Sequence, residues 1–156
     1  MEIKDLLTEE NISLYSDIGS KEQMIRELGR LLMKNKDSEK TDRLIQKIWE
    51  REKEGFTGIG NMAALAHAVP DFISEVSLVC IRSEQKIDWA LEHNVKKHRM
   101  VRLVFLFVVP ESMMDDEDRE ELEVLKQLVL RVGNRDVSQK LLEALDQKEF
   151  IDVLSK

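Results

Sequence analysis

Apolar residues recur every three or four positions in the first third of the chain, which is the period of an α-helix. Ser20 precedes the first such segment, and Gln23 three residues later completes a capping-box pattern at its start. A second helical segment follows the polar stretch 35–40 and ends near Gly55, a common helix stop. Two helices are therefore predicted before residue 56.

The middle third has short apolar runs without a helical period. Residues 63–68, 76–82 and 101–109 form three such runs, and the last two are rich in β-branched side chains. A further short strand is predicted at 11–15. We interpret all of them as strands of one sheet, although their order does not follow from the sequence.

The last third returns to the helical period. The predicted helix begins near Asp115, where acidic residues favour the positive end of a helix. Its expected apolar stripe consists of Leu122, Leu125, Leu128, Val129 and Val132. Two shorter amphipathic segments, 137–145 and 150–154, close the chain. Helices on both sides of a strand region in the sequence predict an α/β or α+β sandwich.

Composition limits the classes of function. The 156 residues are 42% hydrophobic, which predicts a single compact domain spanning 1–156. A net charge of −7 argues against nucleic acid and anionic membranes as partners. The longest near-apolar run, 103–110, is too short to insert into a bilayer, and residues 1–5 do not resemble a signal peptide. Cys80 is the one cysteine, so we expect a buried thiol and a reducing, cytoplasmic location.

Chemistry-bearing residues concentrate in the segment 51–67, where three glycines lie between a predicted helix and a predicted strand. Residues 58–63 also match the loose dinucleotide-binding pattern G-x-G-x-x-A. That motif requires a strand before the glycines and a helix after them. The order here is reversed, so nucleotide binding is disfavoured.

This segment resembles the fructose/mannitol class of phosphotransferase-system IIA domains, which carry the pattern R-E…T-G-I-G-N-G-x-A-x-P-H. Arg51-Glu52, 57–61, Ala64 and His67 occupy the matching positions. The similarity continues through 87–89 and the strand that ends at Pro110, and it reaches the helical tail. It therefore covers nearly the whole chain.

The resemblance implies a phosphotransferase, specifically a cytoplasmic phosphohistidine carrier in sugar transport. It implies that His67 accepts a phosphoryl group from the phosphocarrier HPr and passes it to a IIB domain, with Arg51 in support. It also implies a mixed central sheet with helices on both faces.

The residue types suit this chemistry on their own terms. Imidazole is nucleophilic at neutral pH and is also a good leaving group when phosphorylated. Arg51 offers a permanent forked donor to phosphoryl oxygens, and Thr57 offers a hydroxyl. Backbone amides near Gly58 and Gly60 are further candidate donors, although turn geometry explains these glycines equally well. The role needs neither cofactor nor metal.

Three departures from the family pattern bear on function. Ala66 replaces the usual proline, Met62 replaces a loop glycine and adds bulk beside the site, and 117–122 lacks the second histidine that many transport members carry. These leave the acceptor intact but keep two alternatives open. One is a regulatory module whose His67 phosphorylation controls binding to a protein partner, and the other is a scaffold that accepts no phosphate.

Other polar and apolar candidates are weaker. A docking patch around His67 is expected from Phe56, Met62, Leu65 and Val69, unless these side chains belong to the core. His93 and His98 lie five positions apart and share no face, which argues against a metal site. We interpret the acidic cluster 115–121 as a solvated helix start.

Overall fold

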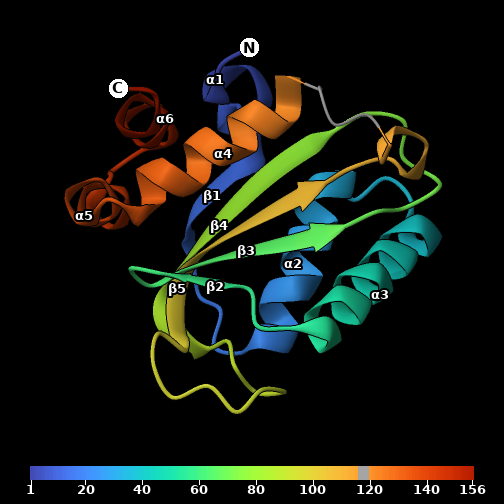
Figure 1. The fold of residues 1–156 in the computed structure, drawn as a ribbon, viewed down its shortest axis with the longest axis horizontal. Coiled ribbons are helices and arrows are strands. Elements are labelled where there is room, and N and C mark those ends of the chain that lie inside the picture. The colour runs from blue at the N-terminus through green and yellow to red at the C-terminus, as the bar shows by residue number, and fades with distance from the viewer. Residues whose placement is uncertain (116–119) are drawn as a thin grey trace.

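The computed structural model describes residues 1–115 and 120–156. Within these residues a five-stranded mixed sheet lies between two groups of helices (Figure 1). The helices are α1 (Ile3–Leu6), α2 (Lys21–Met33), α3 (Ser38–Glu54), α4 (Glu120–Gly133), α5 (Arg135–Glu143) and α6 (Gln147–Ser155). Short 3-10 helices span Glu9–Asn11 and Glu111–Met113. The predicted sandwich, with a mixed sheet and helices on both faces, is confirmed.

The sheet has the strand order β1-β4-β5-β3-β2. Its strands are β1 (Ile12–Ser16), β2 (Gly58–Gly60), β3 (Ala63–Ala68), β4 (Ser77–Asp88) and β5 (Met100–Val108). β1 pairs in parallel with β4, and β3 pairs in parallel with β5. The pairs β4–β5 and β2–β3 are antiparallel. Strand β3, which carries His67, therefore lies next to the edge strand β2.

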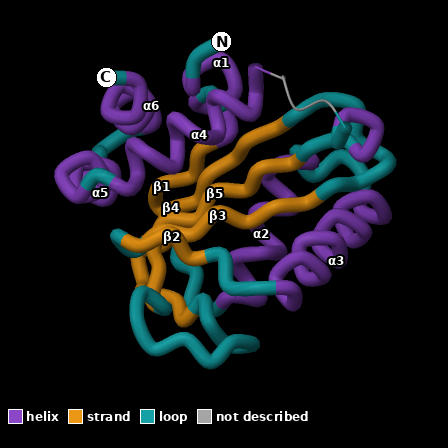
Figure 2. The backbone as a smooth tube through the Cα atoms, in the orientation of Figure 1, coloured by secondary structure: helices purple, strands orange, loops and turns teal. Residues whose placement is uncertain are grey.

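The two faces of the sheet bury separate cores. Helices α1, α4, α5 and α6 cover one face, and α2 and α3 cover the other (Figure 2). Strand β3 contributes side chains to both cores: Ala63 and Leu65 belong to the first, and Ala64 and Ala66 belong to the second. This alternation follows from the two-residue period of a strand. Small side chains in β3 let both helical layers approach closely.

β2 covers only the beginning of β3. Gly58 pairs with Ala64 and Gly60 with Ala63, and one more backbone hydrogen bond joins the Leu65 amide to the Thr57 carbonyl at 3.0 Å. In the described part of the chain no strand lies along the outer edge of β3 at His67. That open edge is where a pocket forms.

The helix boundaries follow their capping residues. The Ser20 hydroxyl accepts a hydrogen bond from the Gln23 amide at 3.1 Å, as the capping pattern predicts. The Gln23 side chain, however, accepts from the Gly19 amide at 3.3 Å rather than from the amide of Ser20. Helix α3 begins after Asp37, whose carboxylate accepts from the Lys40 amide, and it ends before Gly55.

The sequence did not predict every element. β4 continues through exposed polar residues to Asp88, with an irregular register between Arg82 and Ile87. The single-turn α1 and the three-residue β2 have too few residues to generate a period. On α4, Val124 is buried in place of the predicted Val129, which is 37% exposed. The predicted helix start near Asp115 falls partly on residues 116–119, outside the described residues.

Among residues 1–115 and 120–156, no helix combines the length and the apolar composition that crossing a membrane requires.

Candidate functional site

His67 lies near the carboxyl end of β3, paired with Phe107 of β5. Its ring is partly buried, and its Nδ1 atom is enclosed without a hydrogen-bond partner in the described chain. Burial is the larger cause that lowers the pKa of His67 below its ordinary value of 6.5, and the charge of Arg51 is the second. The neutral imidazole is therefore the favoured form at neutral pH.

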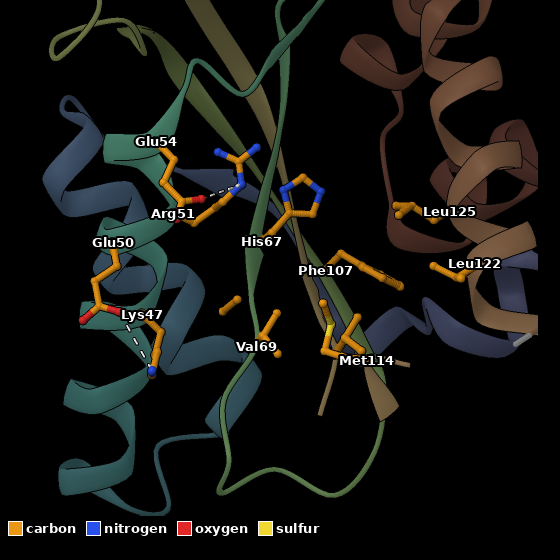
Figure 3. Close-up of a pocket in the computed structure, with 12 residues that line it drawn as sticks. Lys47, Glu50, Arg51, Glu54, His67, Val69, Phe107, Met114, Leu122 and Leu125 are labelled. Atoms are coloured by element: carbon orange, nitrogen blue, oxygen red, sulfur yellow. Dashed lines mark ion pairs between the residues drawn. The ribbon is translucent and has the colours of Figure 1, made fainter. Parts of the chain in front are cut away.

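Arg51 comes from the last turn of α3 and points toward the same place. Figure 3 shows its guanidinium beside the imidazole of His67. The Arg51 Nε atom lies 3.8 Å from a carboxylate oxygen of Glu54, a long and largely solvated contact. Its Nη1 atom is buried and, within the described residues, has no hydrogen-bond acceptor. An enclosed cationic donor without an acceptor favours an anionic ligand.

Both side chains line a cavity of 590 Å³. One wall is charged and comes from α3, and the opposite wall is apolar and comes from β5, the 3-10 segment that follows it, and α4 (Figure 3). The lining residues are Lys47, Glu50, Arg51, Glu54, His67, Ala68, Val69, Phe107, Val109, Met114, Leu122 and Leu125. The site can therefore accept an anion on one side and an apolar group on the other.

Thr57, predicted as a phosphoryl donor, does not line this cavity. It is 5% exposed, and its hydroxyl donates to the Glu52 carboxylate, 2.7 Å from Oε2. The hydroxyl oxygen of Thr57 in turn accepts a hydrogen bond from Trp89 Nε1 at 2.7 Å. Because the hydroxyl proton is already engaged with Glu52, it is not free for a group bound beside His67.

A buried ion pair that was not predicted from the sequence lies next to the site. The Lys21 ammonium lies 2.8 Å from Glu52 Oε1, and both side chains are fully buried. It also contacts Glu92 Oε2 at 2.8 Å and donates to the Trp89 carbonyl at 2.9 Å. One signal was present in the sequence. Lys21 sits in the first turn of a helix, where a cation is disfavoured unless a partner holds it.

The glycine-rich segment forms a tight hairpin between β2 and β3. Gly60, Asn61 and Met62 all have positive φ angles, of 86°, 53° and 62°. This turn lies at the opposite end of β3 from His67 (Figure 1). The sequence predicted that Met62 adds bulk beside the site, but Met62 lies at the other end of β3 and does not line the cavity. Neither Gly58 nor Gly60 lines the cavity. These glycines serve the backbone of the turn.

The four predicted docking residues occupy different places. Val69 is partly buried and lines the cavity. Phe56 packs against the core between the sheet and the α2–α3 layer, and Met62 is in the hairpin. Leu65 is 5% exposed and belongs to the core under α4, because its position in β3 points it inward.

The remaining candidate groups have local roles. The His93 Nε2–H donates to the Glu52 carbonyl at 2.6 Å, while His98 lies in the exposed loop with a φ of 60°. Across residues 1–115 and 120–156, no set of three or more His, Cys, Asp or Glu side chains is arranged to hold a metal ion. Cys80 is buried as predicted, and burial raises the pKa of its thiol well above its usual value.

Comparison with known families identifies the class of protein to which this chain belongs. A family model described as "Phosphoenolpyruvate-dependent sugar phosphotransferase system, EIIA 2" matches residues 5–156. The chain belongs to this family.

Two curated relatives illustrate its range. The chain is 29% identical over 159 residues to a PTS system fructose-specific EIIA component of Haloferax volcanii, covering 100% of this chain and 98% of that protein. It is 28% identical over 153 residues to a multiphosphoryl transfer protein of Shigella flexneri, covering 98% of this chain but 17% of that protein. The chain thus spans nearly all of one relative and about a sixth of the other.

Solved structures share the fold. The nitrogen regulatory protein IIA-Ntr of Neisseria meningitidis superposes with a TM-score of 0.81 at 23% identity, over 98% of this chain and 99% of that one. The enzyme IIA for mannitol of Escherichia coli, solved in complex with phosphorylated enzyme IIB, gives 0.74 at 21% identity. That comparison covers 96% of this chain and 98% of the other. At these identities the likeness concerns the fold alone.

Proposed function

We propose that this chain is a phosphoryl carrier that accepts phosphate on His67 from an HPr-type protein and donates it to a IIB domain of a sugar transporter. One observation carries the proposal. A neutral imidazole and a guanidinium with an unengaged buried donor meet in one cavity. A phosphoryl group on the ring would give that donor its acceptor. Membership of the EIIA 2 family supports the same assignment.

The reaction needs no cofactor. The lone pair of one ring nitrogen of His67 attacks phosphorus as the bond from phosphorus to the donor's nitrogen breaks, so PO3 moves between two imidazoles. In the second transfer a thiolate of the IIB domain attacks phosphorus, and the His67 nitrogen leaves with its electron pair. Arg51 stabilises the charge on the equatorial oxygens in both steps. The protein's contribution is positioning and charge.

Nε2 is the proposed attacking atom. Nδ1 is enclosed and lacks a partner in the described chain, so phosphorus has no approach to it in this conformation. With the proton on Nδ1, the neutral ring presents its lone pair at Nε2. The lowered pKa of His67 keeps this neutral form populated at neutral pH.

The apolar wall is proposed as part of the docking surface. Val69, Met114 and Leu125 line the cavity opposite the charged side of α3. Apolar side chains around a phosphoryl site exclude water during transfer and offer buried contact area to a partner. Transfer between proteins requires both, since water would otherwise hydrolyse the phosphohistidine.

A regulatory module is the second candidate. It is favoured by the IIA-Ntr likeness and by the segment 117–122, which lacks the second histidine that many transport members carry. In that case the phosphorylation state of His67 would control binding to another protein. The fructose-specific relative supports transport.

Labelling tests the carrier role. The chain is incubated with labelled phosphoenolpyruvate, enzyme I and an HPr-type protein, and we expect acid-labile label on the wild type. His67→Gln should take up none, whereas His98→Asn, a control in an exposed loop with a positive φ that asparagine tolerates, should be labelled normally. The phosphorus NMR signal of the product should correspond to Nε2-phosphohistidine. Label on His67→Gln would refute the assignment.

Discharge separates the two candidates. Labelled protein is mixed with the IIB domains of the same cell, and loss of label to a cysteine of one of them supports transport. Stable label with every IIB domain, together with phosphorylation-dependent binding to another protein, would favour regulation.

A further inference from the structure

The residue next to Arg51 is the most firmly held polar side chain near the site. The Glu52 carboxylate contacts the Lys21 ammonium at 2.8 Å and the Thr57 hydroxyl at 2.7 Å. Its backbone carbonyl accepts the 2.6 Å hydrogen bond from His93. Glu52, Lys21 and Thr57 are each no more than 5% exposed. The end of α3 is thus fixed from three directions.

These contacts join segments that are distant in the sequence. Lys21 begins α2, Glu52 lies in the last turn of α3, and Thr57 lies in the loop that leads to β2. Trp89 follows β4, and it donates to Thr57 through Nε1 and accepts from Lys21 through its carbonyl. We call Lys21, Glu52, Thr57 and Trp89 the buried network. The Lys21 ammonium also lies 4.8 Å from the centre of the Trp89 ring, which favours a cation there.

Arg51 is in a different situation. Its backbone belongs to the same helical turn as Glu52, but its side chain has only the 3.8 Å contact with Glu54 and a buried Nη1 without an acceptor in the described chain. Adjacent residues of a helix point about 100° apart, so a turn locked through Glu52 presents Arg51 toward the cavity. The backbone is held while the guanidinium stays free for an anion. This is the arrangement that preorganised charge stabilisation requires.

We propose that the buried network positions Arg51 for phosphoryl transfer at His67, with Thr57 and Glu52 as positioning residues rather than ligands of the phosphoryl group. The inference rests on the proposed function of His67. It assigns a role to Thr57 that differs from the donor role expected from the sequence. It also explains why a costly buried ion pair is kept at this point of the fold.

The decisive variant is Thr57→Val, with Thr57→Ser as its conservative partner. Valine keeps the side-chain volume and both charges but removes the hydroxyl that joins Glu52 to Trp89, whereas serine keeps the hydroxyl. We expect phosphoryl acceptance from the HPr-type donor to be roughly ten- to a hundredfold slower in Thr57→Val, the scale of a displacement of about 1 Å. Thr57→Ser should stay near the wild-type rate.

An NMR titration of the His67 ring measures its pKa, which a loss of stability alone would not change. Arg51 is one of the two causes that lower the pKa of His67, so an Arg51 displaced in Thr57→Val should let that pKa rise toward 6.5. Leu154→Ala, a fully buried change in α6, serves as the destabilised control and should leave the titration unchanged. Circular dichroism confirms that each variant is folded at the temperature used.

The outcomes separate the two proposals. Wild-type protein that accepts no phosphate would overturn the proposed function, while the titration would still report whether the network sets the position of Arg51. If Thr57→Val is less stable but keeps both the rate and the His67 titration of the wild type, the network is structural only and the positioning role is refuted.

Discussion

Arg51, in the last turn of α3, lies beside His67, near the end of β3 (Figure 3). Within the described chain, Nη1 of Arg51 and Nδ1 of His67 are both buried without a hydrogen-bond partner. Such atoms are few in native structures, because leaving a buried donor or acceptor unpaired costs about 1–3 kcal/mol. Both residues line the same cavity. In the proposed function, a phosphoryl group on Nε2 of the ring gives the Arg51 donor an acceptor, while Nδ1 stays enclosed.

The first prediction concerns pH. Because burial and Arg51 lower the pKa of His67, NMR should give a titration midpoint below 6.5. The rate of phosphoryl acceptance should stay constant as the pH falls, and it should decrease only near that midpoint. Arg51→Gln should raise the midpoint. The unfolded chain binds the proton more readily, so His67 lowers the free energy of unfolding progressively as pH falls through 6.5. A midpoint above 6.5 would contradict the site as described.

The second prediction concerns the buried ion pair. Lys21→Met leaves the Glu52 carboxylate buried without its ammonium, and it should lower the free energy of unfolding by about 3–5 kcal/mol. The double variant Lys21→Met/Glu52→Leu removes both charges and should recover much of that loss. Urea unfolding of the single and double variants measures the coupling. Additive losses would mean that the two charges do not interact as described.

The third prediction concerns the hairpin. Met62 has a φ of 62°, a conformation that costs a side chain about 1–2 kcal/mol relative to glycine. Met62→Gly relieves this strain but makes the unfolded chain more flexible, which opposes part of the gain. The net result should be a free energy of unfolding higher by about 1 kcal/mol. Met62→Ala is the control, since it shortens the side chain but keeps the strain. Equal stability of the two variants would show that backbone strain is not the cause.

The fourth prediction concerns docking. Val69 lines the cavity, whereas Met62 is at the far end of β3. Val69→Asp should weaken binding of the HPr-type donor by about 1 kcal/mol or more, measured by NMR titration. Met62→Asp is the matched control, because aspartate tolerates a positive φ, and it should bind as the wild type does. An equal loss in both variants would extend the docking surface to the hairpin.

The sequence predicted the elements that have a clear period or a cap. The helical period of the first third, the Ser20 cap and the stop at Gly55 each depend on neighbouring residues, so they can be recognised locally. The resemblance of 51–67 to IIA domains also identified His67 and Arg51, the two residues that the cavity brings together.

Long-range contacts could not be predicted in this way. The partners of Lys21 lie at Glu52 and Glu92, and no local pattern links these positions. Thr57 was assigned to the phosphoryl group because of its place in the motif, but its hydroxyl is directed by Trp89 and Glu52. The motif supplies the residue types, while the fold determines that Arg51 and His67 line the cavity and Thr57 does not.

The register of β3 has a consequence for synthesis of the protein. Every residue of β3 has a register partner in the parallel strand β5, from Ala63 opposite Leu103 to Ala68 opposite Val108. On the ribosome, the strand that carries His67 therefore emerges well before the strand that must hold it. A nascent chain stopped before residue 108 cannot assemble the acceptor site. Its apolar β3 residues then remain unpaired, so they are accessible to chaperones and prone to aggregation.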